Sequence, residues 1–294
     1  MMSVKRILIA FNPVSGRGRA SQFATAIAAE LLQHPCDVEM CPTQPADPKK
    51  WFSPMLHTKP DAVIAVGGDG TLRQIASELL GTSIPIYHAA SGTENLFAKS
   101  LSLSTDPTAI VNSIMNANVK IIDTAIANKS FMLLMGSVGF DADVVARLAA
   151  SRGASITHFS YAIPIIKTFA LFSPPTISID VDGSSAIDNQ VGFAVVANSR
   201  AYARGLNPAR KALIDDGLLD VVFLPIRTRL QFLKWLRLMK KGTHLHHQNA
   251  VQLRGESVTV STNSPAFVQL DGDTIGKHSK VRYTIKKHSL CVLE

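Results

Sequence analysis

The most constraining feature of the sequence is a pattern of strand, glycine-containing loop and helix that recurs in its N-terminal part. Residues 6–11 (RILIAF) are a short apolar run followed by a loop and by helical periodicity over 22–32. Residues 61–66 (DAVIAV) lead into GGDGT and a helical segment over 72–80, and 84–90 (IPIYHAA) is a third strand. Alternating strands and helices predict a parallel, doubly wound sheet with its ligand site at the carboxyl ends of the strands.

After about residue 119 the pattern changes to short strands separated by turns, with helical insertions expected over 142–172 and 228–241. This second pattern predicts a mainly antiparallel β-sandwich domain. The expected domains are an α/β domain over 1–122, a β-rich domain over 123–283, and a strand near 284–294 that can return to the first domain.

Composition narrows the class of protein. Hydrophobic residues make up 46% of the 294 residues and charged residues 18%, so the chain is expected to be globular. The excess of 30 Lys and Arg over 22 Asp and Glu favours anionic partners. The N-terminus is unlike a signal peptide, and the longest apolar stretch, 161–174, is too short to span a bilayer. Three irregularly spaced cysteines suggest a reducing compartment, so we expect a cytoplasmic protein.

The loop Gly67-Gly68-Asp69-Gly70-Thr71 follows a buried strand and precedes a helix. Glycines allow backbone N–H groups to approach an anion closely, and the helix N-terminus favours phosphate. Because Asp69 would repel a phosphate directly, it predicts Mg²⁺ between the protein and a nucleotide. An ordinary tight turn is the alternative interpretation.

Two more loops, 12–18 and 91–95, also follow predicted strands. All three would converge on one crevice if the strands are neighbours. The sequence contains no Gly-Lys-Ser/Thr phosphate loop, no G-x-G-x-x-G after the first strand and no G-x-S-x-G elbow, so those common families are excluded.

Motifs along nearly the whole chain resemble bacterial lipid kinases of the diacylglycerol kinase catalytic-domain superfamily, whose relatives include sphingosine kinases. GGDGT alone is shared with NAD kinases and phosphofructokinases; the later motifs favour lipid kinases. In chain order the matching motifs are NPVSGRG (12–18), GGDGT (67–71), GTENLFAK (92–99), IID (121–123), GFDADVV (139–145), ALIDDGLLDVV (212–222) and QLDGD (269–273).

The resemblance implies an NAD kinase/diacylglycerol kinase-like fold. It makes 1–122 the nucleotide-binding domain and 123–283 the lipid-substrate domain, with ATP in the cleft between them. It implies a structural Mg²⁺ on Asp216 with the carbonyls of Leu213 and Leu218, and it makes Asp273 the general base, with Asp69 organising Mg²⁺. The implied nucleotide-binding residues are Asn12, Ser15, Gly16, Thr43, Gly67, Gly68, Asp69, Gly70, Thr71, Thr93 and Asn95.

The sequence departs from its relatives at two positions. Many relatives have Asp where this chain has Leu96, while Glu94 lies two residues earlier. The usual Asp-Gly-Glu is Asp271-Gly272-Asp273, which is one methylene shorter. These departures motivate the alternative of a non-catalytic nucleotide- or lipid-binding regulator.

Other polar residues have two interpretations each. The basic face of the helix over 230–241 could lie on an anionic membrane or simply be solvated. Asp123 could belong to the site or cap a turn. Two further groups are a basic cluster that could hold phosphates or lipid headgroups (Arg200, Arg204, Arg210, Lys211) and three histidines for which zinc binding is not expected (His244, His246, His247).

The leading interpretation is therefore an ATP- and Mg²⁺-dependent lipid kinase that phosphorylates a lipid hydroxyl, with diacylglycerol the first candidate. We expect peripheral contact with an anionic membrane and no binding of nucleic acid. A homodimer is compatible with the sequence. The alternatives are the non-catalytic regulator and an NAD kinase. Against the latter, the residues after GGDGT lack its adenine- and nicotinamide-binding pattern.

Overall fold

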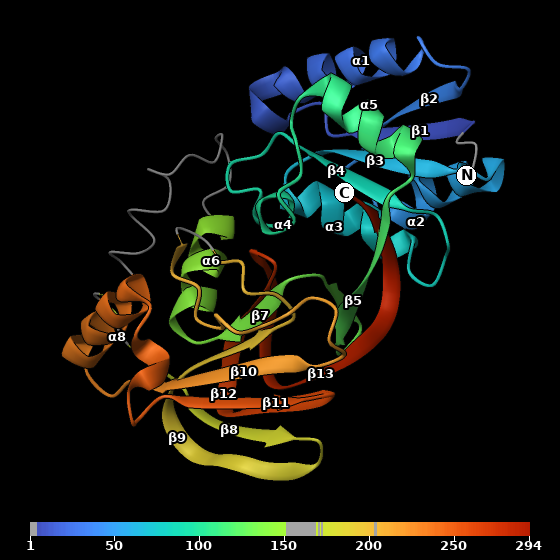
Figure 1. The fold of residues 1–294 in the computed structure, drawn as a ribbon. Coiled ribbons are helices and arrows are strands. Elements are labelled where there is room, and N and C mark those ends of the chain that lie inside the picture. The colour runs from blue at the N-terminus through green and yellow to red at the C-terminus, as the bar shows by residue number, and fades with distance from the viewer. Residues whose placement is uncertain (1–4, 151–168, 170, 172, 203–204) are drawn as a thin grey trace. The chain divides into compact units, whose positions relative to one another are not determined.

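The computed structural model describes residues 5–294 except 151–168, 170, 172 and 203–204 (Figure 1). The chain divides into two compact units. Unit 1 comprises Met1–Ile122 with His288–Glu294, and unit 2 comprises Asp123–Lys287. No helix in the part of the chain that the structure describes is long and apolar enough to cross a bilayer.

Unit 1 contains a parallel sheet in the order β4-β3-β1-β2, with the end of β13 paired to the free edge of β4. The β3 strand is buried along its whole length, as expected for apolar residues between two layers of helices. Its strands are β1 (Arg6–Phe11), β2 (Asp37–Pro42), β3 (Ala62–Gly67), β4 (Ile86–Ala90) and the last residues of β13 (Asp273–Leu293).

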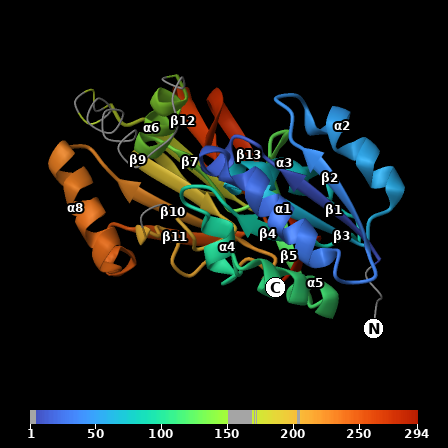
Figure 2. The ribbon, with the colours of Figure 1, turned by 90° about the horizontal axis from the view of Figure 1, so that it is seen from above.

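Helices cover both faces of this sheet (Figure 1). The α1 and α5 helices pack on one face, where α1 buries Ala20, Ala24, Ile27 and Leu31, and α2 and α3 lie on the other. Figure 2 shows α1 lying over the strands. The helices are η1 (Ser15–Gly18), α1 (Arg19–Leu31), α2 (Pro48–Trp51), η2 (Ser53–Thr58), α3 (Asp69–Glu78), α4 (Leu96–Ser100) and α5 (Pro107–Asn116).

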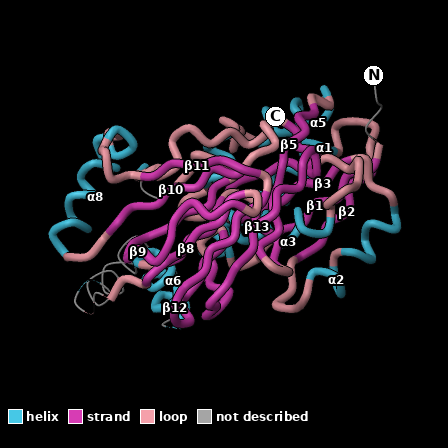
Figure 3. The backbone as a smooth tube through the Cα atoms, turned by 90° about the horizontal axis from the view of Figure 1, so that it is seen from below, coloured by secondary structure: helices cyan, strands magenta, loops and turns pink. Residues whose placement is uncertain are grey.

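Unit 2 consists mostly of strands (Figure 3), and these pair mainly in the antiparallel direction. Along the main path its strands follow the order β11-β10-β9-β7-β12-β13. They are β5 (Val119–Ala127), β6 (Ser130–Met132), β7 (Met135–Val138), β8 (Thr176–Val181), β9 (Ser184–Ala197), β10 (Leu219–Pro225), β11 (Val251–Gly255), β12 (Ser257–Leu270) and β13.

Two long strands join the layers of unit 2. Both β9 and β12 pair with β8 through their first halves and with β7 through their second halves. Strands that change partners in this way form the corners of a sandwich. The apolar core lies between the layers and includes Ile179, Phe223 and Val260.

The helices of unit 2 are α6 (Phe140–Ala150), α8 (Arg229–Lys241) and the short η5 (His244–His246). The Thr228 hydroxyl caps α8 by accepting a hydrogen bond from Gln231 N, and Gly242 ends the helix in a left-handed conformation.

The predicted fold class is confirmed: a parallel, doubly wound sheet is followed by a mainly antiparallel unit. Some boundaries differ from the prediction. The α1 helix begins at Arg19, and β9 begins at Ser184. The first residues of β9 are mostly polar and exposed, so they carry no apolar alternation and the start of this strand is not marked in the sequence. Most of the helical insertion expected over 142–172 lies outside the described residues.

Candidate active site

Asn12 joins the ends of two strands in unit 1. Its backbone N–H donates to Val66 O at 3.0 Å, and its side-chain Nδ2 donates to Thr71 Oγ1 at 3.3 Å. Its Oδ1 accepts a hydrogen bond from Val14 N at 3.1 Å, which shapes the turn that leads to Ser15. This residue therefore ties the first loop to the GGDGT loop.

The GGDGT loop is closed by glycine. A Cβ atom on Gly67 would lie 2.5 Å from Thr71 Cβ, so no larger residue fits there without a shift. The α3 helix begins at Asp69, and Gly68, in an extended conformation, precedes it. Amides of this first turn have no partners within the helix, and the helix dipole favours an anion there.

The loop over 91–95 packs directly on its neighbours. A Cβ on Gly92 would lie 2.5 Å from Gly68 Cα, and one on Gly16 would lie 2.7 Å from Ser91 O. Asn95 closes the loop in a left-handed conformation, accepting from Gly92 N at 2.9 Å and donating to Gly92 O at 3.0 Å. The structure thus brings together three of the predicted nucleotide-binding loops.

The remaining predicted nucleotide-binding residues differ in their surroundings. Thr93 is exposed, and Thr43 follows β2 with its N–H donating to Phe11 O at 2.8 Å, beside the end of β1. The Ser91 hydroxyl is buried without a hydrogen-bond partner among the described residues. Polar groups available at these strand ends fit a phosphorylated ligand.

Asp69 makes structural contacts that the motif does not reveal. Its two carboxylate oxygens accept hydrogen bonds from Leu96 N at 2.9 Å and Phe97 N at 3.1 Å, at the start of α4. The His88 ring is buried behind it, with Nε2 3.2 Å from Gly67 O. Burial lowers the pKa of His88, and the nearby Asp69 charge opposes that shift. Asp69 therefore holds two loops together, whatever it contributes to a metal.

The second candidate turn, Asp271-Gly272-Asp273, lies between β12 and β13 in unit 2. The Asp271 carboxylate accepts hydrogen bonds from three consecutive backbone amides, at 2.8, 2.7 and 2.9 Å: Leu133, Leu134 and Met135. Asp271 has φ 51° and Gly272 has φ 86°, so the chain reverses sharply. Asp271 fixes the turn, and partly buried Asp273 begins the next strand.

A buried polar network supports the same turn. Gly272 N donates to Gln269 Oε1 at 2.9 Å, Gln269 Nε2 donates to Ser137 Oγ at 3.0 Å, and Ser137 Oγ donates to Asp141 at 2.8 Å. Burial raises the pKa of the Asp141 carboxyl, and hydrogen bonds from Ser137, Tyr202 and Gln269 oppose the rise. Burial also raises the pKa of Tyr202 well above its ordinary value, and the Asp141 charge adds to this.

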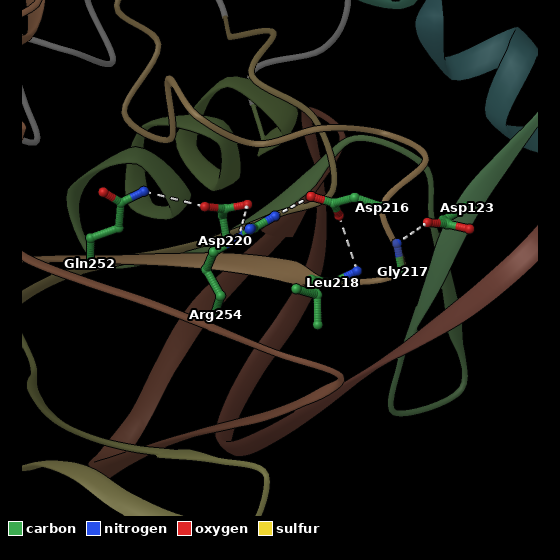
Figure 4. Close-up of polar contacts among 7 residues, drawn as sticks. All are labelled: Asp123, Asp216, Gly217, Leu218, Asp220, Gln252 and Arg254. Atoms are coloured by element: carbon green, nitrogen blue, oxygen red, sulfur yellow. Dashed lines mark hydrogen bonds and ion pairs between the residues drawn. The ribbon is translucent and has the colours of Figure 1, made fainter.

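An arginine from β11, Arg254, approaches the Asp216 turn (Figure 4). The Arg254 guanidinium pairs with Asp216 and, at 3.3 Å, with the fully buried Asp220. Asp216 Oδ1 also accepts from Leu218 N at 3.2 Å. Burial raises the pKa of Asp220, and Arg254 and Gln252 oppose that shift.

These contacts bear on the predicted structural Mg²⁺. The ion would need oxygen ligands around Asp216, such as the carbonyls of Leu213 and Leu218. In this arrangement a guanidinium already neutralises Asp216 and would repel a second cation, so the turn does not fit a divalent ion unless Arg254 moves away. Among the described residues, no three His, Cys, Asp or Glu side chains gather as a metal site. The metal role of this turn stays a prediction.

Asp123 lies beside this turn and organises it. Its Oδ2 accepts from Gly217 N at 2.6 Å, its N–H donates to Ile214 O at 2.8 Å, and Asn198 Nδ2 donates to its carbonyl at 2.8 Å. The residue is fully buried. Of the two interpretations from sequence, these contacts support the turn-holding role.

The other polar candidates are dispersed. His244 is buried with Nε2 2.6 Å from Pro208 O, and His247 Nε2 lies 2.8 Å from Lys234 Nζ. The Arg210 guanidinium packs against Gly242. Arg204 of the predicted basic cluster lies outside the described residues.

Sequence reasoning missed Arg254, Gln269, Ser137, Asp141 and Tyr202 as supporting residues. Gln269 and Asp141 lie within quoted motifs, so their polar character on otherwise apolar segments was the available signal. Nothing local marks Arg254 on β11, because its partners are 34 and 38 residues away.

Comparison with known proteins agrees with this two-unit architecture. Residues 6–127 match the diacylglycerol kinase catalytic domain, and residues 135–293 match the YegS C-terminal NAD kinase beta sandwich-like domain. A diacylglycerol kinase of Mycobacterium tuberculosis is 27% identical over 270 residues, which cover 89% of this chain and 86% of that protein.

Two further comparisons extend the likeness. An uncharacterised protein of Synechocystis is 29% identical over 223 residues, which are 73% of this chain and 50% of that protein, so the match spans half of its length. A crystal structure of a diacylglycerol kinase from Bacillus anthracis superposes with a TM-score of 0.77 at 21% identity, covering 100% of this chain and 98% of that one. At this identity the superposition supports the fold alone.

Proposed function

Because the chain belongs to the lipid kinase family that joins a diacylglycerol kinase catalytic domain to a YegS-type C-terminal domain, we propose that it transfers the γ-phosphoryl group of Mg-ATP to a hydroxyl of a membrane lipid. Diacylglycerol is the first candidate, since the M. tuberculosis relative carries that name. The observation that carries the proposal is the mutual packing of three glycine-containing loops at the carboxyl edge of β1, β3 and β4.

In this proposal the loops of unit 1 bind the nucleotide. Backbone N–H groups at the start of α3 and in the 91–95 loop donate hydrogen bonds to phosphate oxygens. Asn12 keeps the first loop against Thr71. Asp69 keeps α4 against the GGDGT loop, and the same carboxylate would hold a nucleotide-bound Mg²⁺, which would neutralise phosphate charge. Phosphoryl transfer requires mainly such positioning and charge neutralisation.

Unit 2 supplies the base. Asp273 accepts the proton of the lipid hydroxyl as its oxygen forms a bond to the γ-phosphorus, and the bond from that phosphorus to the bridging oxygen breaks, leaving ADP. The hydrogen bonds of Asp271 and Gln269 hold the turn in place, so the backbone position of Asp273 is fixed. No step is placed on the Asp216 turn.

The test is a transfer assay with labelled ATP and Mg²⁺ over separate acceptors. The acceptors are diacylglycerol, a total lipid extract and NAD, and each product is identified after extraction. Label in phosphatidic acid supports the diacylglycerol proposal, while label in another extracted lipid supports the kinase and corrects its acceptor. Label in NAD phosphate, or ATP binding at equilibrium without transfer to any acceptor, contradicts the proposal in favour of an NAD kinase or a non-catalytic binding protein respectively.

A further inference from the structure

The α8 helix of unit 2 is anchored by its inner side. Phe232, Trp235 and Met239 are 6%, 3% and 6% exposed. The indole Nε1 of Trp235 donates to Pro225 O at 2.8 Å, at the end of β10. The helix therefore has a defined inner and outer side, and Figures 1 and 2 show it at the periphery of its unit.

The outer side combines leucines with cations. Leu230 is 78% exposed and Leu233 is 48% exposed. Because an α-helix repeats every 3.6 residues, both lie on the same stripe as Lys234, Arg237 and Lys241. We call these five residues the α8 outer face. The segment 229–241 (RLQFLKWLRLMKK) contains no acidic residue, and it also carries Arg229 and Lys240.

Ordinary structural roles explain only part of this composition. Lys240 and Lys241 lie in the last turn, where cations complement the helix dipole, and Lys234 contacts His247. A solvated helix surface would account for exposed Arg237. Neither role accounts for two exposed leucines among these cations, since apolar surface left in water contributes nothing to the stability of the folded unit.

We propose that the α8 outer face docks on an anionic lipid bilayer. Leucine side chains enter the boundary between headgroups and acyl chains, while the surrounding cations approach lipid phosphates. The occupant follows from charge complementarity, because a cationic helix without acidic residues is attracted to an anionic surface. The physiological benefit rests on the proposed function, since a lipid kinase must reach a substrate held in a bilayer.

Vesicle sedimentation tests this directly. The whole protein is incubated with phosphatidylcholine vesicles or with phosphatidylcholine vesicles that contain phosphatidylglycerol. We expect the parent to bind the anionic vesicles, and L230Q/L233Q to weaken this binding roughly tenfold through lost apolar burial. Charge removal in K234Q/R237Q/K241Q is expected to weaken it roughly a hundredfold at low salt.

Matched controls distinguish this face from the general positive charge. L32Q changes an exposed leucine in unit 1, and K49Q/K50Q/K280Q removes three exposed cations elsewhere. Both controls should bind within about threefold of the parent. If the α8 substitutions leave vesicle binding unchanged, the proposal is overturned, and a protein partner becomes the candidate occupant of this face. If binding falls equally in the controls, the general positive charge is responsible and the proposal is overturned as well.

Kinase activity is measured separately on substrate dispersed in neutral detergent micelles, where the α8 variants should match the parent. Loss of vesicle binding with retained micelle activity supports docking by α8. If the parent phosphorylates no lipid but still binds anionic vesicles through α8, the docking proposal stands and the proposed function fails. If the parent phosphorylates lipid but the α8 variants bind vesicles normally, the proposed function stands and the docking proposal fails.

Discussion

The two units hold their candidate site loops by different means. In unit 1, backbones approach so closely that a side chain on Gly67 or Gly92 would collide with its neighbours. In unit 2, carboxylates hold the turns: Asp271 accepts three amide hydrogen bonds, and Asp123 accepts a hydrogen bond from Gly217 N. The first arrangement depends mainly on missing side chains, to which Asp69 adds two hydrogen bonds, and the second depends on buried or partly buried carboxylates.

This difference predicts different vulnerabilities. Glycine-packed loops should fail by steric crowding, at any pH. Carboxylate-held turns should fail when an acceptor is lost, because amides inside the protein would then lack partners.

Asp273→Asn is expected to lower kcat by about 10²- to 10⁴-fold, because a positioned base contributes that much to proton transfer. ATP affinity should change little, since the proposed nucleotide contacts lie in unit 1. Asp273→Glu should keep substantial activity, because it restores the side chain usual among relatives. Steady-state kinetics and equilibrium ATP binding decide the matter: turnover by the Asn variant within about threefold of the parent would exclude Asp273 as the base.

Asp271→Ala should instead destabilise the protein by about 3 kcal/mol or more, because three amides lose one charged acceptor. Asp271→Asn should cost less, since an amide oxygen still accepts and Asn tolerates positive φ. Urea unfolding monitored by circular dichroism measures both. If Asp271→Ala unfolds at the parent's midpoint, the contrast between these neighbouring acids fails.

Gly92→Ala should destabilise unit 1 by about 1–3 kcal/mol, because the added Cβ must displace the Gly68 backbone. It should also weaken ATP binding. Gly68→Ala is the graded comparison, since its Cβ would lie 3.3 Å from Gly92 Cα, within reach of a small adjustment. Isothermal titration with ATP and thermal melting should rank the two variants in that order; equal effects would argue against steric packing.

Arg254→Met should destabilise the protein by roughly 1 kcal/mol at neutral pH, because Asp216 and buried Asp220 lose their cation. Burial already raises the folded-state pKa of Asp220, and loss of Arg254 raises it further. Protonation of Asp220 therefore stabilises the folded variant at low pH, and this stabilisation is lost as pH rises through the folded pKa. The deficit relative to the parent should therefore shrink as the pH is lowered from neutral.

Urea melts of the parent, Arg254→Met and Arg254→Met/Asp220→Asn measure this dependence. A deficit that is constant with pH would show that Asp220 is not responsible. Repeating the melts with Mg²⁺ and with a chelator also tests the predicted metal. A parent midpoint that rises with Mg²⁺, and stops doing so in Asp216→Ala, would support an ion at this turn.

The sequence predicted the fold and the glycine loops well because their determinants are local. A buried strand followed by GGDGT predicts, within a dozen residues, both a parallel sheet and a closely packed loop at the strand's carboxyl end. The role of Asp69 as a bridge to Leu96 and Phe97 was not predictable, because the partner amides have no side-chain signature and lie 27 and 28 residues away.

The same limit applies in unit 2. The motif singles out Asp273 as the base, but only the fold brings the amides of 133–135 to its neighbour Asp271. The polar network through Ser137 and Asp141 depends on pairing between β7 and β12, residues more than 130 apart. Long-range antiparallel pairing is the part of the structure for which single-sequence periodicity carries least information.

The route of β13 has a consequence for biosynthesis. Its first residues pair with β12 in unit 2, and its last pair with β4, where Leu290, Val292 and Leu293 are buried in unit 1. The ribosome therefore makes all of Asp123–Lys287 before it makes the end of β13 that covers the edge of β4. Until then the nascent N-terminal unit has an open sheet edge, a template for mispairing, so its protection during translation depends on how quickly the intervening unit folds.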